Sequence, residues 1–136
     1  MCSSDLAKLG TTDRVRLVGR QPPAEVARFM QAADVLCVPS KLEGVPNVLL
    51  EGFACGLRAV ATRVGGIPEV LDKDFLGTLV PSADTTALTA ALAQLLATNA
   101  DRAAILRHAE QFSWSATTER YGSVLREAVE GARAGR

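Results

Sequence analysis

The sequence predicts an α/β protein with a Rossmann-like parallel sheet and flanking helices, followed by a helical C-terminal segment. Short apolar runs alternate with longer segments that carry apolar residues at helical spacing, which is typical of a parallel sheet covered by helices. The short runs are rich in valine and leucine and barely alternate with polar residues, as expected where both faces of a strand are buried. The length of 136 residues fits one domain with its own core.

Four apolar runs are predicted to form the strands of this sheet: Val15–Gly19, Val35–Pro39, Ala59–Thr62 and Thr78–Pro81. Helices are expected between them at Pro23–Ala33, Pro46–Cys55 and Ile67–Leu71. The first two begin at a proline, which suits the first turn of a helix, and the second stops at Gly56, a natural C-terminal cap. Ligand chemistry in such folds lies at the carboxyl ends of the strands. The loops there are Gly19–Pro22, Pro39–Pro46 and Arg63–Gly66.

Three further helices are expected after Pro81, with N-terminal caps at Asp84, Asp101 and Ser113. The last of them carries Trp114 and Tyr121, which we interpret as core residues that dock the helix on the domain. From Gly131 the residues are small or charged. Residues 1–130 are therefore expected to form the domain and residues 131–136 a frayed tail.

The composition excludes several classes of protein. Fifteen basic residues balance fifteen acidic ones, so no nucleic-acid partner is expected. No apolar run approaches the roughly eighteen residues of a membrane span, and the first residues lack the pattern of a signal peptide, so a cytoplasmic protein is expected. Cys37 and Cys55 lie in apolar stretches and are interpreted as small core residues of a reducing compartment. One histidine and three scattered cysteines supply no metal ligand set, so neither a metal nor another cofactor is expected, and His108 is interpreted as a surface residue.

The loop with the strongest functional signal runs from Ser40 to Pro46. It leaves a predicted buried strand and leads directly into a helix, where free backbone N–H groups and the positive end of the helix dipole favour an anion. Gly44 removes a side chain where a ligand can approach the backbone closely. Glu43 at the same place can accept hydrogen bonds from neutral hydroxyl groups.

The helix that follows is nearly all apolar, and Glu51 is its only charged residue. At about 100° per residue, Asn47, Glu51 and Arg58 fall along one narrow stripe, so they are equally consistent with a solvated face. A carboxylate one turn inside a helix whose N-terminus faces a ligand can also hold a ribose diol, as an acidic residue does in dinucleotide-binding folds. Glu51 taken alone does not decide between the two interpretations.

Seven residues, Gly-Val-Pro-Asn-Val-Leu-Leu, separate Glu43 from Glu51. This spacing resembles the E-x7-E motif of the family 4 glycosyltransferases, enzymes of the two-domain GT-B fold. Further matches follow in order over roughly residues 14 to 125: Ala32-Ala33-Asp34-Val35, Pro39-Ser40, Glu43 to Gly56, Ala61-Thr62, Val64 to Val70, Gly77, Leu79-Val80-Pro81 and Phe112-Ser113-Trp114. An isolated pair of glutamates at this spacing arises by chance, whereas the ordered set is a strong signal.

The resemblance implies roles for individual residues of a donor site. Glu43 matches the glutamate that contacts hydroxyls of the donor sugar, and it is the expected catalytic residue, acting through positioning and electrostatics rather than as a nucleophile. Glu51 matches the glutamate that holds the ribose hydroxyls. The implied remaining donor-binding residues are Gly44, Val45, Pro46 and Asn47 near the sugar and diphosphate, Val48 at the nucleotide, and Gly19 and Arg20 at the base.

The resemblance also implies a retaining glycosyltransferase that uses a nucleotide-diphosphate sugar as donor, has no metal in the donor site, and acts on an unidentified acceptor. This chain would be an incomplete C-terminal domain that supplies the donor-binding half, with an N-terminal acceptor domain as its missing partner. The isolated chain is therefore expected to be inactive. In the sheet order 3-2-1-4-5-6, the two absent strands would separate Val15–Gly19 from the others. That run is expected either to pair with Val35–Pro39 or to form an exposed edge.

Two alternatives stay open beside this interpretation. The chain could be a non-catalytic Rossmann-type module that binds a nucleotide or sugar, or an incomplete gene product without a role of its own. The intact pair Glu43 and Glu51 favours the enzyme, because a module without chemistry has little need of a contact to sugar hydroxyls. Gly65-Gly66 is interpreted as a tight turn rather than a phosphate site. A peripheral membrane association of the full enzyme is also left open, since these residues do not bear on it.

Overall fold

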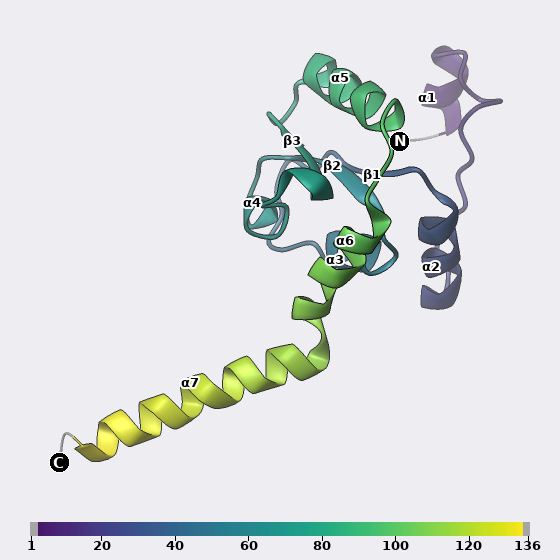
Figure 1. Cartoon of the computed structure of the whole chain (residues 1–136). Helices are drawn as coiled ribbons and strands as arrows, with labels where there is room; N and C mark the ends of the chain where they lie inside the picture. Colours follow the sequence, from purple (N-terminus) through teal and green to yellow (C-terminus); the bar gives the residue numbers. More distant parts are fainter. Residues whose placement is uncertain (1–2, 135–136) are drawn as a thin grey trace.

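The computed structural model describes residues 3–134 as a three-stranded parallel sheet with helices on both faces (Figure 1). The strands are β1 Val35–Val38, β2 Arg58–Thr62 and β3 Gly77–Val80. The helices are α1 Ser3–Lys8, α2 Pro23–Ala32, α3 Asn47–Ala54, α4 Ile67–Val70, α5 Thr85–Leu96, α6 Arg102–Ala109 and α7 Trp114–Ala134, with 3₁₀ turns η1 Asp74–Leu76 and η2 Glu110–Phe112. The predicted α/β class with a helical C-terminal segment is confirmed.

The sheet has the order β1-β2-β3, and both pairs of strands are parallel. Val35 lies opposite Arg58, and Ala59 lies opposite Gly77. Every residue of the central strand β2 is buried, which explains why this run shows no alternation with polar residues. Three of the four predicted strands are therefore confirmed, with bounds that differ by one residue.

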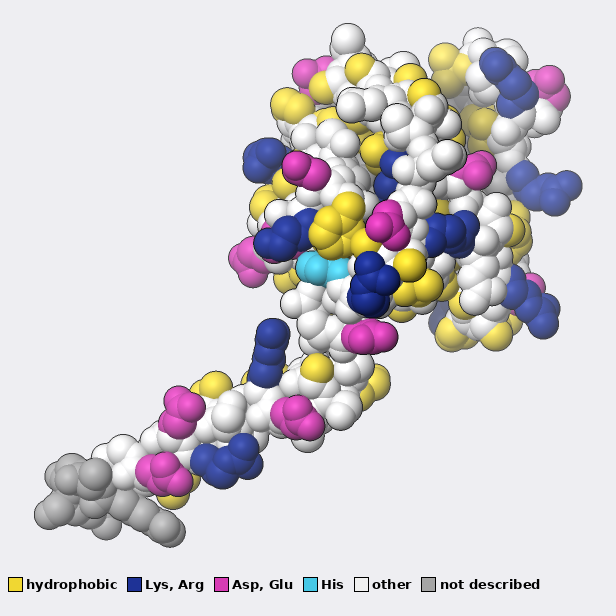
Figure 2. All heavy atoms as spheres, in the orientation of Figure 1, with side chains coloured by type: hydrophobic (Ala, Val, Ile, Leu, Met, Phe, Trp, Pro, Cys, Tyr) yellow, Lys and Arg dark blue, Asp and Glu magenta, His cyan; other side chains and the backbone are white. Residues whose placement is uncertain are grey.

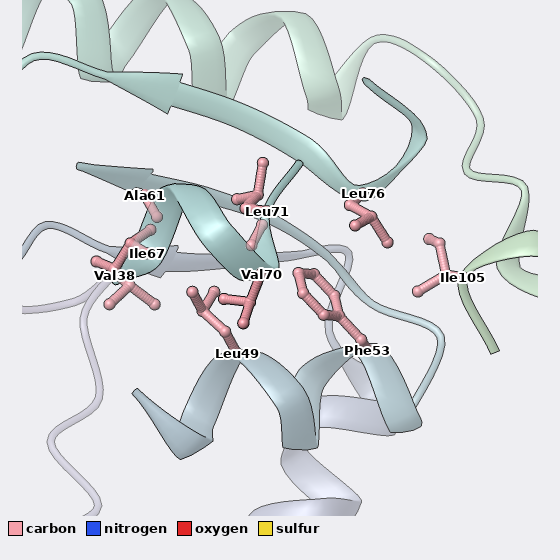
Figure 3. Packing of buried hydrophobic residues seen from close by; sticks show 10 residues of the cluster. Val38, Leu49, Phe53, Ala61, Ile67, Val70, Leu71, Leu76 and Ile105 are labelled. Atoms are coloured by element: carbon pink, nitrogen blue, oxygen red, sulfur yellow. The ribbon is translucent and has the colours of Figure 1, made fainter. Parts of the chain in front are cut away.

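Two hydrophobic clusters hold the helices to the sheet. On one face, Leu49 and Phe53 of α3 are fully buried and belong to one cluster with Ile67 and Val70 of α4 (Figure 3). On the other face, Leu95 of α5 packs against Val60 of β2. Because the strand residues alternate between the two clusters, β2 is fixed from both sides and its carboxyl end has a defined position.

The three predicted helix caps are confirmed. The Asp84 carboxylate accepts a hydrogen bond from the backbone N–H of Ala87 at the start of α5, and Asp101 does the same for Ala104 in α6. The Ser113 hydroxyl accepts a longer bond, 3.3 Å, in the first turn of α7. Each cap satisfies one of the free N–H groups of a helix start, which is why these polar residues mark the boundaries in the sequence.

The strand predicted at Val15–Gly19 is wrong. The segment is irregular, it joins neither edge of the sheet, and Leu17 is 57% exposed. The expected pairing with Val35–Pro39 is wrong for the same reason: within residues 3–134, β1 pairs with β2 alone. An apolar run forms a stable strand only when a neighbour supplies hydrogen bonds and a surface to cover, and no such neighbour occurs within the described residues.

The irregular conformation of residues 16–19 predicts fast hydrogen exchange of their amides. Among the described residues, no backbone carbonyl accepts a hydrogen bond from the amides of residues 16–19. We expect these amides to exchange less than about tenfold more slowly than in an unstructured peptide, because exchange there needs no opening step. The amides of Val60 and Ala61 in the buried strand β2 serve as the internal reference. Protection of residues 16–19 that matched the reference would contradict the irregular conformation.

The interpretation of Trp114 and Tyr121 as core residues is also wrong. Their exposed fractions are 88% and 70%. The chain turns at Ser113, which is extended, and α7 then projects away from the body, so none of the other described elements covers these side chains (Figures 1 and 2). The helix continues through Gly131 to Ala134, so the described part of the expected tail is helical, and the last two residues lie outside the described range.

Two further side chains differ from their predicted environments. Cys37 is exposed because it lies on β1, an edge strand with one neighbour, although partial desolvation still raises the pKa of its thiol. His108 is not a surface residue: its side chain is 13% exposed and lies between the rings of Phe75 and Phe112. Its Nε2 atom is 3.9 Å from Asp72, whose pKa is lowered chiefly by a hydrogen bond from Lys73.

Candidate functional site

The loop that follows β1 is held in place by the turn that follows β2. The Thr62 hydroxyl donates a hydrogen bond to the backbone carbonyl of Ser40, and the N–H of Gly66 donates one of 2.9 Å to the carbonyl of Gly44. Gly65 has φ +52°, and a Cβ atom there would lie 1.7 Å from the carbonyl oxygen of Glu43. Only glycine allows the two loops to approach this closely. The interpretation of Gly65-Gly66 as a tight turn is therefore confirmed.

Glu43 is fixed within this loop by a side-chain contact. Glu43 is half-buried, and the Ser40 hydroxyl donates a hydrogen bond of 2.9 Å to its Oε1 atom. No other described side chain makes a hydrogen bond to the Glu43 carboxylate. Its second oxygen is therefore free to accept a hydrogen bond from a ligand hydroxyl while the first keeps its orientation.

Helix α3 begins directly after this loop with unsatisfied backbone donors. Pro46 occupies the N-cap position, and no described side chain caps the helix start. The N–H of Leu49 donates a hydrogen bond to the carbonyl of Pro46, whereas those of Asn47 and Val48 have no partner among the described residues. The first backbone N–H groups of a helix have no partner within the helix, and they carry the positive end of its dipole. The chain therefore presents an anion-binding position beside Glu43, within the segment Gly44–Val48 that the sequence singled out.

Glu51 lies one turn further along α3 and is exposed. It borders a cavity of about 500 Å³ that Gln21, Val26 and Met30 of the α2 region also line. It borders a second cavity, of about 560 Å³, toward Trp114. Glu43 lines neither of these two cavities, so the two glutamates present their carboxylates at different places along one loop–helix unit.

Gly19 and Arg20 are the predicted site residues that lie outside the Glu43 loop and α3. Both are exposed in the irregular segment before α2, and Gly19 has φ +65°. Neither lines the cavity beside Glu51, whereas the next residue, Gln21, does. The sequence interpretation missed Gln21 and Ser40. The serine had a local signal, since it stands three residues before Glu43, whereas the position of Gln21 depends on the packing of α2 against α3.

Two other kinds of functional feature, a metal site and a membrane-spanning helix, do not occur among the described residues. Within residues 3–134, no three histidine, cysteine, aspartate or glutamate side chains gather closely enough to hold a metal ion. None of the helices in that range combines the length and the apolar character that crossing a membrane requires.

Comparisons with known proteins identify relatives of this segment. Residues 3–98 match the family described as glycosyl transferases group 1. The chain is 40% identical over 130 residues to a D-inositol 3-phosphate glycosyltransferase of Saccharomonospora viridis, covering 92% of this chain and 30% of that protein. It is 41% identical over 129 residues to the protein of the same description from Thermobispora bispora, covering 91% and 30%.

A solved structure agrees with these sequence relationships. Sucrose-phosphate synthase from Thermosynechococcus elongatus superposes with a TM-score of 0.78 at 29% identity, over 94% of this chain and 33% of that one. The chain thus spans about 30% of the length of the curated relatives it matches.

Proposed function

Because the chain belongs to the group 1 glycosyltransferases, we propose that the complete polypeptide transfers a sugar from a nucleotide-diphosphate sugar to an acceptor in the cytoplasm. In this proposal the chain supplies the donor-binding half, and an N-terminal domain outside it binds the acceptor. The observation that carries the proposal is one loop–helix unit, in which Glu43 is oriented by Ser40 beside the uncapped start of α3 and Glu51 follows one turn later.

The start of α3 binds the diphosphate. Its free N–H groups and dipole favour an anion, and Gly44 lets the ligand approach the backbone. Val45, Pro46 and Asn47 line the same approach. No metal is required in this arrangement, because backbone donors and basic groups supply the positive potential that stabilises the leaving diphosphate.

Glu51 binds the ribose. Its exposed carboxylate accepts hydrogen bonds from the two ribose hydroxyls, in the way that an acidic residue does in dinucleotide-binding folds. The cavity of about 500 Å³ beside it has the space for this group. Val48 contacts the nucleotide from the first turn of the helix, and the base lies toward Gly19 and Arg20.

Glu43 acts on the sugar. Its free oxygen accepts a hydrogen bond from a sugar hydroxyl and stabilises positive charge that develops on the ring in the transition state. We propose that the configuration at the transferred carbon is retained without a covalent intermediate on Glu43. A double displacement of the glycosidase kind needs a second carboxylate roughly 5–5.5 Å away that acts as acid. Among the described side chains, the one that forms a hydrogen bond with the Glu43 carboxylate is the hydroxyl of Ser40.

Ser40→Ala is expected to weaken binding of the nucleotide sugar about fivefold and to leave binding of the nucleoside diphosphate unchanged. The loss corresponds to about 1 kcal/mol for one hydrogen bond that orients Glu43. Calorimetric titration of both ligands measures the difference. Ser82→Ala is the matched control, because Ser82 is exposed in a turn before α5. An equal loss for both ligands would contradict the assigned role of Ser40.

The proposed function is tested by an activity assay on the complete polypeptide. Purified protein is incubated with UDP-, GDP- and ADP-sugars and a panel of hydroxyl acceptors, and release of nucleoside diphosphate is measured together with the anomeric configuration of the product. We expect transfer with retention from one donor class, and none from the isolated 136-residue chain. Donor binding without transfer would instead favour the non-catalytic binding module, and an inverted product would contradict the retaining mechanism.

A further inference from the structure

A separate cleft runs beside the free edge of β3. It has a volume of about 800 Å³ and lies between the C-terminal half of α5 and the segment from α4 to η1. Thr78 contributes to the β3 side of this cleft, and Gln94 and Thr98 contribute to the α5 side. All three carry hydrogen-bonding side chains, so the cleft can bind a polar molecule.

Arg58 at the start of β2 lines this cleft and is buried, with 9% of its surface exposed. Its Nη1 atom donates a hydrogen bond of 3.0 Å to the Thr98 hydroxyl. Its Nη2 atom donates hydrogen bonds to the backbone carbonyls of Leu95 and Thr98 at the end of α5. The Nε atom is buried without any partner. A guanidinium has five N–H donors, so these three bonds leave two unused: the N–H of Nε, which is shielded from solvent, and one N–H of Nη1, which is the donor left for a molecule in the cleft.

The charge of Arg58 is also incompletely balanced. No described carboxylate forms an ion pair with it, although a buried charge is normally paired. The carbonyls at the end of α5 provide only about half of an elementary negative charge. Arg58 is thus a buried cation with a free Nη1 donor beside an open polar cleft, and an anion in the cleft would supply the counter-charge that it lacks.

The other charged groups of the cleft reinforce this imbalance. Arg63 lines it and makes no ion pair with the described residues, and Lys73 pairs with Asp72 at 2.9 Å. Asp74 is the remaining carboxylate of the lining. Three cations thus face two carboxylates, and one of these carboxylates is already neutralised by Lys73.

We propose that this cleft binds a small anionic molecule through a phosphate or carboxylate group, with Arg58 as the buried cation of the site. Arg58 begins β2 and Thr62 ends it, and at about 3.3 Å per residue the two lie on the order of 13 Å apart. Since Thr62 bonds to the loop of Glu43, the Arg58 end of the cleft lies at the opposite end of β2 from that loop, while Arg63 lines the cleft beside Thr62. The site does not depend on the proposed glycosyl transfer.

The proposal is tested by titrating the full chain with inorganic phosphate and, separately, with citrate at constant ionic strength. Amide chemical shifts report where each anion binds. We expect saturable shifts at Thr78, Gln94 and Thr98 with at least one of the two. Binding of phosphate alone identifies a phosphate ligand, and binding of citrate alone identifies a carboxylate ligand. No saturable shift at these residues with either anion would overturn the proposal.

Variants separate a specific site from general attraction of anions. Arg58→Gln is expected to raise the dissociation constant about tenfold or more, because it removes a charge-assisted contact. Lys73→Gln and Arg63→Gln alter exposed side chains, so the fold should stay intact, and each is expected to raise the dissociation constant several-fold. These two variants keep the test decisive if Arg58→Gln does not fold. Arg107→Gln, an exposed cation of α6 outside the cleft, is the control. Equal weakening in the control, or none in the Lys73 and Arg63 variants, would contradict the site.

Discussion

Gly65→Ala is expected to lower the free energy of unfolding by about 3 kcal/mol and to displace the loop that carries Glu43. Two causes add. The backbone at Gly65 has φ +52°, which disfavours any residue with a Cβ atom, and that atom would stand 1.7 Å from the carbonyl oxygen of Glu43. Because the loop cannot stay in place beside an alanine, affinity for the donor should fall together with stability. Urea unfolding and calorimetric titration of the nucleotide sugar measure the two effects.

Gly10→Ala is the matched control for this prediction. Gly10 has φ +62°, similar to Gly65, but a Cβ atom there meets nothing within 4 Å. The control therefore carries only the conformational cost of a left-handed backbone, about 1–2 kcal/mol. The difference between the two variants isolates the contact with the Glu43 loop. If Gly65→Ala cost no more than Gly10→Ala, the close packing of the two loops would be refuted.

Glu51→Ala is expected to weaken binding of the nucleoside diphosphate by ten- to a hundredfold, an order-of-magnitude figure for hydrogen bonds to a charged group. Glu43→Ala should leave this ligand nearly unaffected and weaken only the sugar-bearing donor, because Glu43 contacts the sugar in the proposed arrangement. Glu51→Gln keeps the shape and one acceptor and is expected to lie between wild type and Glu51→Ala. Calorimetry with both ligands on each variant provides the measurement.

The pattern of losses across the two ligands decides the outcome. Equal losses for both ligands in both variants would contradict the division of roles between Glu43 and Glu51. An unchanged affinity in Glu51→Ala would support the alternative that Glu51 belongs to a solvated helix face, which its exposure also permits.

Local patterns were sufficient for most of the fold. The buried run at Ala59–Thr62 became β2, and Asp84 and Asp101 capped the helices predicted for them. These features depend on residues close together in the sequence: a strand buried on both faces, or a side chain that satisfies the N–H groups of the next turn. The same holds for the loop–helix unit of Glu43 and α3, because the sequence itself predicts a buried strand, a loop and then a helix there.

The predictions that were wrong have a different cause. They depend on contacts with residues that are distant in the sequence. Val15–Gly19 has the composition of a strand, but no described strand lies beside it, and Trp114 has the character of a core residue but remains exposed in the part of the chain that the structure describes. The contact of Gly65 with Glu43 and the position of Gln21 beside Glu51 arise from tertiary packing. Local periodicity carries no information about whether such a partner is present.

Mapping where a nucleotide sugar binds on the protein is the decisive test of the donor site. Amide chemical shifts of the complete polypeptide are followed while the preferred donor is titrated to saturation, and the free nucleoside diphosphate is titrated in parallel. We predict that the donor shifts the amides from Glu43 to Val48 together with Glu51, and that the diphosphate shifts those from Asn47 to Glu51 while leaving Glu43 nearly unchanged. Saturable donor binding without change between Glu43 and Glu51 would contradict the assignment of this loop and helix as the donor site.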